Sequence, residues 1–200
     1  MSKAYHHVNR RGDVYFLQSV RGKSGQLKYS FARKLTGIPV EKLPEGYEPR
    51  ENPASAQVTL RRIKRSAIRT EEKQLLEQAI RNHADGLLFI VDVEDRSLVV
   101  YTSDMDAGDA EARINVLRQI VPMDAATAAR TKAEIVGNAP YGRMMRFTLI
   151  DAKNRLFNMD RWCFSGGIDD WYFVEGDAPL PALAEKYVCH LGQDSFFDLM

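Results

Sequence analysis

The chain has 200 residues with 44% hydrophobic and 28% charged side chains, a balance that excludes a wholly disordered chain and is enough for a sizeable core. Its formal net charge is +1, its longest clean apolar run covers only 87–91, and residues 1–13 carry no apolar stretch after their charges, so we expect neither a membrane span nor a secretory signal. The two cysteines, Cys163 and Cys189, form no C-x-x-C pair, which predicts a reducing, cytoplasmic location.

The N-terminal third is predicted to consist of short strands and turns. Residues 13–18 form a compact β-type run, 20–25 supply two glycines for a turn, and 26–34 return with a period of two. The proline-rich stretch 38–53 is interpreted as a connecting loop with at most one short extended piece. Residues 57–65 form a third strand, which we expect to leave the sheet near its end because neither of its faces is purely apolar there.

The remainder is predicted as helices and antiparallel strands, from apolar periodicity and capping residues. The predicted order is a helix at 71–85 with Thr70 as its N-cap and Gly86 at its end, a hairpin at 87–103, helices at 107–121 and 124–137, a three-strand meander at 143–176, and closing helices at 180–192 and 194–200.

These elements predict the α+β class, because strands and helices do not alternate strictly. We expect a basic, antiparallel, β-rich N-terminal module at 1–66, packed with a larger acidic body at 67–200 that contains hairpins, the meander and four to five helices. One integrated domain is the alternative.

The charges are distributed very unevenly between these two parts. Residues 1–70 hold 15 Lys and Arg against 5 Asp and Glu, a net of +10, whereas residues 71–200 hold 13 against 22, a net of −9. Such a split predicts two surfaces with different partners, or two surfaces that attract each other.

The basic third suits a nucleic-acid backbone, because Lys and Arg release condensed counterions and aromatic rings among them can stack on bases. The sequence therefore predicts a non-catalytic nucleic-acid-associated protein. Two alternatives stay open: a protein-interaction or self-assembly module whose basic face docks on an acidic protein surface, and a solvated strand face without a partner. The oligomeric state is left open. The candidate nucleic-acid-binding residues are Arg21, Lys23, Lys28, Arg33, Lys34, Arg61, Arg62, Lys64 and Arg65.

A second hypothesis is a metal-dependent nuclease. The stretch "FTLIDAK" matches the D-x-K pattern of restriction-type nucleases, whose chemistry needs two carboxylates on a divalent ion and a lysine beside the attacking water. Asp151 and Lys153 fill two of these roles, and Glu134 or Asp124 is the candidate for the second carboxylate. The same residues equally make a hairpin turn between two strands.

Three other motifs are too incomplete to predict a site, and we expect no cofactor and no metal. "RGKSG" lacks the first glycine of a P-loop and is followed by a strand. "SGGID" resembles a pyrophosphate loop, but Asp170 stands where that loop has a serine. The cysteines and histidines have no zinc-finger spacing.

Several stretches together carry a resemblance to a group of uncharacterised prokaryotic conserved proteins. The likeness extends over nearly the whole chain and implies one integrated architecture, but no activity or site. The stretches are "RRGDVYFLQ", "KYSFARK", "LPEGYEPRENP", "QVTLRRI", "RWCFSGGIDDW" and "HLGQDSFFDLM".

Overall fold

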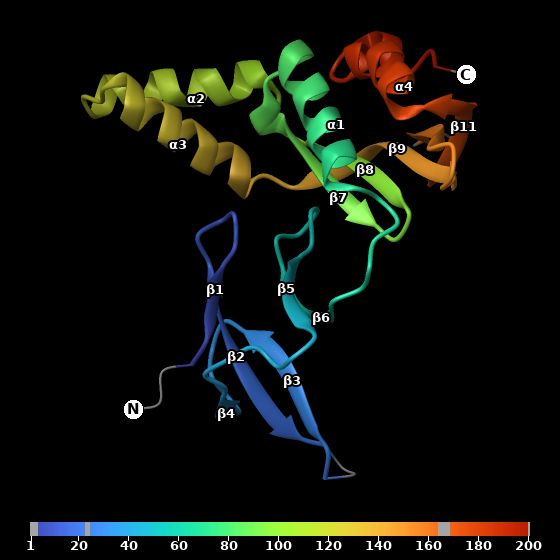
Figure 1. The fold of residues 1–200 in the computed structure, drawn as a ribbon. Helices are drawn as coiled ribbons and strands as arrows, with labels where there is room; N and C mark the ends of the chain where they lie inside the picture. Colours follow the sequence, from blue (N-terminus) through green and yellow to red (C-terminus); the bar gives the residue numbers. More distant parts are fainter. Residues whose placement is uncertain (1–3, 23–24, 164–168, 200) are drawn as a thin grey trace. The chain divides into compact units, whose positions relative to one another are not determined.

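A computed structural model describes residues 4–22, 25–163 and 169–199. The chain divides into two compact units, which we call the N-terminal unit (Met1–Arg65) and the C-terminal unit (Ser66–Met200). Within the described residues the structure contains four α-helices and three antiparallel sheets (Figure 1), so the predicted α+β class is confirmed.

The N-terminal unit contains two small antiparallel sheets. In the first, β2 lies between β3 on one side and β1 and β4 on the other. In the second, β5 and β6 form a hairpin, and β6 lies next to β3. The strands are β1 (His6–Val8), β2 (Val14–Arg21), β3 (Leu27–Ala32), β4 (Ile38–Pro39), β5 (Tyr47–Glu51) and β6 (Val58–Arg62).

The core of this unit is small and includes a buried amide. Leu17 and Val58 are almost fully buried, whereas several apolar side chains on neighbouring strands stay exposed. The buried Gln18 is satisfied because its Oε1 accepts backbone N–H groups from Thr36 and Gly37, each at 2.8 Å. These two bonds hold the loop before β4 against β2.

The tight approach at Gly37 gives a stability prediction. A Cβ placed there would lie 2.6 Å from the backbone oxygen of Ser19 and 3.0 Å from Val20 Cγ2. Because the first neighbour is backbone, we expect Gly37→Ala to destabilise the N-terminal unit by about 1–3 kcal/mol. Amide hydrogen exchange, recorded at increasing urea concentrations, measures the free energy of unfolding of the N-terminal unit. Gly22→Ala is the control, since its Cβ would meet Lys28 Cε at 3.4 Å and that side chain can move; equal losses for the two variants would contradict the prediction.

The C-terminal unit is built on one five-stranded antiparallel sheet in the order β11-β10-β9-β8-β7. Each strand pairs with the next along the chain, although two helices separate β8 from β9. The strands are β7 (Phe89–Glu94), β8 (Ser97–Ser103), β9 (Tyr141–Asp151), β10 (Leu156–Cys163) and β11 (Asp170–Pro179).

In the described part of this unit, four helices and three short 3₁₀ turns accompany the sheet. The helices α2 and α3 begin after Asp106 and Asp124, whose carboxylates accept the backbone N–H groups of Asp109 and Thr127. The bounds are α1 (Thr70–His83), η1 (Gly86–Leu88), α2 (Ala107–Ile120), α3 (Ala125–Asn138), α4 (Leu180–Tyr187), η2 (Val188–His190) and η3 (Asp194–Phe196).

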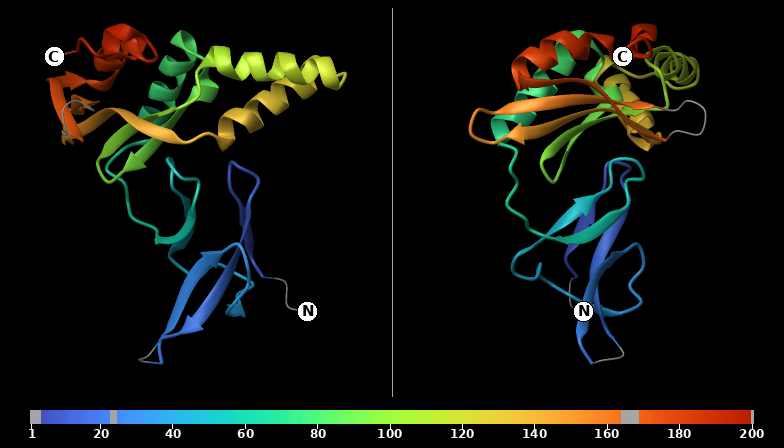
Figure 2. Two further views of the ribbon diagram at one scale, coloured as in Figure 1. Left: turned by 180° about the vertical axis from the view of Figure 1, so that it is seen from behind. Right: turned by 90° about the vertical axis from the view of Figure 1, so that its right-hand side faces the viewer.

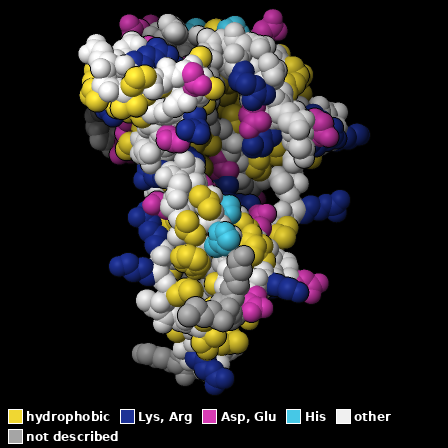
Figure 3. All heavy atoms as spheres, turned by 90° about the vertical axis from the view of Figure 1, so that its left-hand side faces the viewer, with side chains coloured by type: hydrophobic (Ala, Val, Ile, Leu, Met, Phe, Trp, Pro, Cys, Tyr) yellow, Lys and Arg dark blue, Asp and Glu magenta, His cyan; other side chains and the backbone are white. Residues whose placement is uncertain are grey.

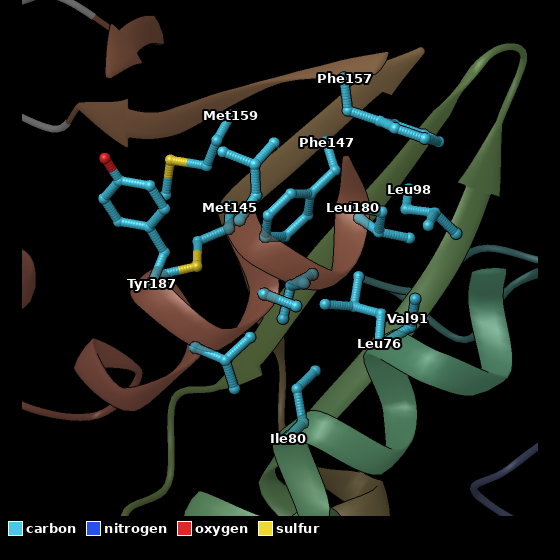
Figure 4. Packing of buried hydrophobic residues seen from close by; sticks show 14 of the residues in the cluster. Leu76, Ile80, Val91, Leu98, Met145, Phe147, Phe157, Met159, Leu180 and Tyr187 are labelled. Atoms are coloured by element: carbon cyan, nitrogen blue, oxygen red, sulfur yellow. The ribbon is translucent and has the colours of Figure 1, made fainter. Parts of the chain in front are cut away.

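The main core lies between one face of the sheet and the helices α1 and α4 (Figures 1 and 2). Figure 4 shows Phe147 and Phe157 from the strands in one cluster with Leu180 of α4 and Leu76 of α1. These side chains are at most 2% exposed. Burial of this set supplies the main driving force for folding of the unit.

A second, smaller cluster lies on the opposite side of β8, because successive strand residues face opposite ways. Val99 and Tyr101 pack there with Ala110 of α2 and Val136 of α3. Burial, together with a hydrogen bond to Glu94, raises the pKa of Tyr101 to about 12.

Several expected elements are confirmed and several are corrected. The helices at 107–120 and 125–138 match their predictions, and Asp124 is the N-cap as expected. Thr70 as N-cap is wrong: Arg69 holds that position, and Glu72 accepts its backbone N–H at 2.8 Å. Of the second closing helix, expected at 194–200, the described residues 194–199 form only the 3₁₀ turn η3. Among the described residues, none of the helices combines the length and the apolar composition that crossing a bilayer requires.

Candidate nucleic-acid interface

The strand register places the cations of the β2–β3 hairpin on both faces of its sheet. Arg21 lies opposite Leu27, and Lys28 lies opposite Val20, so Arg21 and Lys28 belong to opposite faces. Tyr15, expected among the cations, is 6% exposed and belongs to the core, whereas Tyr29 is 39% exposed. The hairpin therefore carries its charges on both of its faces.

Three arginines of the N-terminal unit are paired with carboxylates of the same unit. Arg10 Nη1 lies 2.6 Å from Glu51 Oε1, and Arg61 Nη2 lies 2.6 Å from Glu48 Oε1. Arg33 Nη2 lies 2.8 Å from Asp13 Oδ2. The Arg33 Nε–H also donates to the Tyr15 hydroxyl, and this bond, with the nearby Asp13, raises the pKa of Arg33. To reach a phosphate, Arg33 and Arg61 must first leave these partners.

The other predicted cations have no carboxylate partner among the described residues. Arg62 lies over the ring of Tyr47, with Cζ 5.9 Å from the ring centroid. Lys23 lies outside the described residues. The exposed side chains with neither an ion pair nor a hydrogen bond inside the described part of the chain are Arg21, Lys28, Lys34, Lys64 and Arg65.

Arg62, Lys64 and Arg65 form the densest group of these cations, and we call them the β6 cations. Strand β6 ends at Arg62, so Lys64 and Arg65 follow the strand at the end of the unit. All three side chains are exposed. The strand predicted at 57–65 was expected to leave the sheet near its end, and the end of β6 at Arg62 agrees with that expectation.

Internal pairing leaves most of the positive charge of the N-terminal unit uncompensated. Residues 1–65 contain 14 Lys and Arg but only 5 Asp and Glu, a net of +9. Its own carboxylates therefore cannot neutralise the unit, whatever their geometry. On the face shown in Figure 3, the Lys and Arg side chains of this unit stand apart, with hydrophobic side chains between them.

The residues of the nuclease hypothesis have other contacts in the structure. Asp151 closes the β9–β10 turn: its Oδ1 accepts the backbone N–H groups of Lys153 and Asn154, at 2.8 and 2.9 Å. The hydrogen bonds that Asn154 donates lower the pKa of Asp151, and its backbone N–H has the largest effect. Asp151 therefore has the role that the sequence offered as the alternative to a nuclease site, namely a hairpin turn between two strands.

The carboxylates proposed to join Asp151 come from the far end of β9. Helix α3, which carries Glu134, leads into β9 at Tyr141, and Asp151 is the last residue of that strand. Ten residues of strand span about 33 Å. Asp124 caps α3. The described residues contain no group of three or more His, Cys, Asp or Glu placed to hold a metal ion.

The remaining motifs have equally local roles. Cys163 is half-buried and Cys189 is exposed, with its thiol donating to the carbonyl of Lys186. Asp170 accepts its neighbour's backbone N–H. Ser165, Gly166 and Gly167 of "SGGID" lie outside the described residues.

The carboxylates that hold the three arginines are the site residues that the sequence did not predict. Asp13 lies 20 residues from Arg33, Glu48 lies 13 residues from Arg61, and Glu51 lies 41 residues from Arg10. Contacts between segments distant in the chain bring each carboxylate to its arginine, and no local pattern marks these contacts.

Comparison with known proteins yields no family model, no curated protein and no solved structure that matches this chain.

Proposed function

We propose that the N-terminal unit associates with nucleic acid through the phosphate backbone, without catalysis. The observation that carries this proposal is the net charge of +9 on residues 1–65, which five carboxylates cannot compensate. A polyphosphate is the natural partner for such a unit, because each neutralised phosphate releases condensed counterions.

The β6 cations are the proposed centre of contact. These three residues lie within the four positions 62–65, where Ile63 is the remaining residue. None of the three has a carboxylate partner among the described residues. Arg21, Lys28 and Lys34 extend the contact along the β2–β3 hairpin. The spread of these residues over both faces of the hairpin favours sequence-independent association over reading of base edges.

A salt titration tests the proposal directly. Binding of the full chain to a mixed-sequence duplex is measured by fluorescence anisotropy at several salt concentrations. With about five phosphate contacts the slope of log K against log salt is near −4.5 for duplex DNA. Single-stranded DNA and double-stranded RNA in parallel identify the preferred polymer. Absence of binding at low salt, or binding that salt does not weaken, would contradict the proposal.

Release of one paired arginine should strengthen the association. Glu48→Gln removes the carboxylate that holds Arg61, so a further guanidinium becomes available, and we expect affinity near 0.1 M salt to rise about fivefold. The pair is exposed, so the fold should lose at most about 1 kcal/mol. Glu45→Gln is the matched control: it removes the same charge from the same unit, but Glu45 has no partner among the described residues. An equal gain in both variants would assign the effect to net charge alone.

A second candidate function, docking on an acidic protein surface, is favoured by the exposed apolar side chains of the same unit. Val8, Val20 and Ile38 are 52%, 49% and 59% exposed. An interface that combines apolar burial with charge should respond to salt less steeply than a phosphate contact. Size-exclusion chromatography at low and high salt separates the two: self-association or a retained partner at high salt supports docking.

A further inference from the structure

The C-terminal unit contains a cavity of about 570 Å³ that is separate from the proposed polyanion interface. Five segments line it: the end of α1, the start of β7, the stretch from the end of β8 into α2, Met144 of β9, and the chain around η3. Its volume falls within the range of small-molecule sites, which are roughly 300–1,000 Å³.

The wall of this cavity is largely apolar. Met144 and Leu191, which are 9% and 3% exposed, belong to the main core, and Leu88 packs against the smaller cluster. Phe89 adds an aromatic surface. Phe197 is 59% exposed although it lines the same cavity, so a ligand that covers its ring would remove apolar surface from water.

Most of the ionisable side chains around the cavity are acidic, and His83 is the basic one among the described lining residues. Four aspartates line it, and no Lys or Arg is among the described lining residues. Asp106 caps α2, and Asp85 is held by Lys132 at 2.8 Å. Asp104 and Asp194, which come from different segments, have no side-chain hydrogen bond or cation partner within the part of the chain that the structure describes.

One buried hydroxyl at the cavity has an unused proton. Ser103 is 7% exposed and lines the cavity, and its Oγ accepts the backbone N–H of Met105 at 3.1 Å. Its own O–H has no acceptor among the described residues. Ser103 Oγ is already satisfied as an acceptor, and because a hydroxyl can donate and accept at once, its O–H is available to a ligand oxygen.

We propose that this cavity binds an organic cation: an amine or guanidinium group carried on an apolar body that also presents one hydrogen-bond acceptor. The apolar body covers Leu88, Leu191 and Phe197, the charge lies with Asp104 and Asp194, and Ser103 donates to the acceptor. Asp104 and Asp194 are exposed, and carboxylates beside an aromatic ring are a combination that recognises organic cations. A free amine and the side chain of a lysine or arginine in a peptide share this chemistry.

Calorimetric titration of the full chain tests this site with three probes. Phenethylamine supplies the free amine, Nα-acetyl-lysine methylamide supplies the peptide form, and 2-phenylethanol is the neutral comparison. We expect at least one cationic probe to bind in the low millimolar range or tighter and 2-phenylethanol to bind about tenfold more weakly. The stronger cationic probe identifies the source. No binding of either cation, or equal binding of the alcohol, would overturn the proposal.

A matched pair of variants then locates the binding. In D104N/D194N we expect affinity for the cation to fall about 10- to 100-fold, while affinity for 2-phenylethanol stays the same. D109N/D198N removes the same charge from the same two segments, but neither residue lines the cavity, so the cation should bind as before. Equal losses in both double variants would show a general field effect and overturn the assignment. Phe197→Ala should weaken the cation about threefold, and no change would remove the ring from the site.

Discussion

Replacing the three β6 cations by glutamine in R62Q/K64Q/R65Q is expected to reduce the salt slope for duplex DNA by about 2.7, because each phosphate contact contributes about 0.9. Affinity near 0.1 M salt should fall roughly 100-fold. All three side chains are exposed and none has a carboxylate partner among the described residues, so no buried group is left unpaired. The anisotropy titration of the unmodified chain provides the reference, and circular dichroism confirms that the variant is folded.

The control for this prediction removes the same charge elsewhere. R96Q/R118Q/R130Q changes three arginines of the C-terminal unit, each of which is exposed. We expect its salt slope to equal that of the unmodified chain. If the two triple variants lose affinity equally, the field of the whole protein is responsible and the β6 cations are not a contact site. If R62Q/K64Q/R65Q keeps the full slope, the polyanion proposal loses its central residues.

The elements that could be predicted from the sequence are those whose signals are local. Helix α3 is an example: Asp124 is its cap, and the apolar period places Ala128 and Val136 in the core. The whole signal lies within 14 residues. The strands of the meander could be predicted for the same reason, because the alternation of apolar residues and the turn residues both lie within one short segment.

Strand β5 shows where this reasoning fails. Its proline and its acidic neighbours are typical of a connecting loop, yet Pro49 lies directly opposite Leu60 in the β5–β6 hairpin. Within the described residues β5 pairs with β6 alone, so the proline sits in an edge strand, where a missing N–H costs no ladder bond. Pairing with a separate strand, in which Leu60 is the partner of Pro49, decides its conformation, and single-segment propensity cannot show that.

The candidate sites depended even more on distant contacts. The positive charge of the N-terminal unit is a property of composition, so it was visible in the sequence, but which arginines remain available was not. Arg61 and Arg62 are neighbours in β6 but have different partners. Arg61 pairs with Glu48, whereas Arg62 lies over the ring of Tyr47. The cavity was not predicted at all, since its lining residues are spread from His83 to Phe197.

The two units should also respond separately to loss of their core side chains. Phe147 is fully buried between the sheet and its helices, and Phe147→Ala is expected to destabilise the C-terminal unit by about 3–5 kcal/mol. Leu17 is fully buried in the N-terminal unit, and Leu17→Ala should cost that unit about 2–5 kcal/mol. Amide hydrogen exchange of the full chain reads both units at once.

We expect each substitution to reduce protection from amide exchange only in the unit that contains it. Phe147→Ala should speed exchange in Ser66–Met200 while Met1–Arg65 keeps its protection and the chain keeps its salt-dependent binding. Leu17→Ala should speed exchange in Met1–Arg65 alone and weaken binding, because the β6 cations and the β2–β3 hairpin then lose their fixed spacing. Loss of protection across the whole chain in either variant would mean that the units fold as one cooperative body. Binding that survives Leu17→Ala unchanged would mean that the cations act as a flexible basic segment, without need of the sheet.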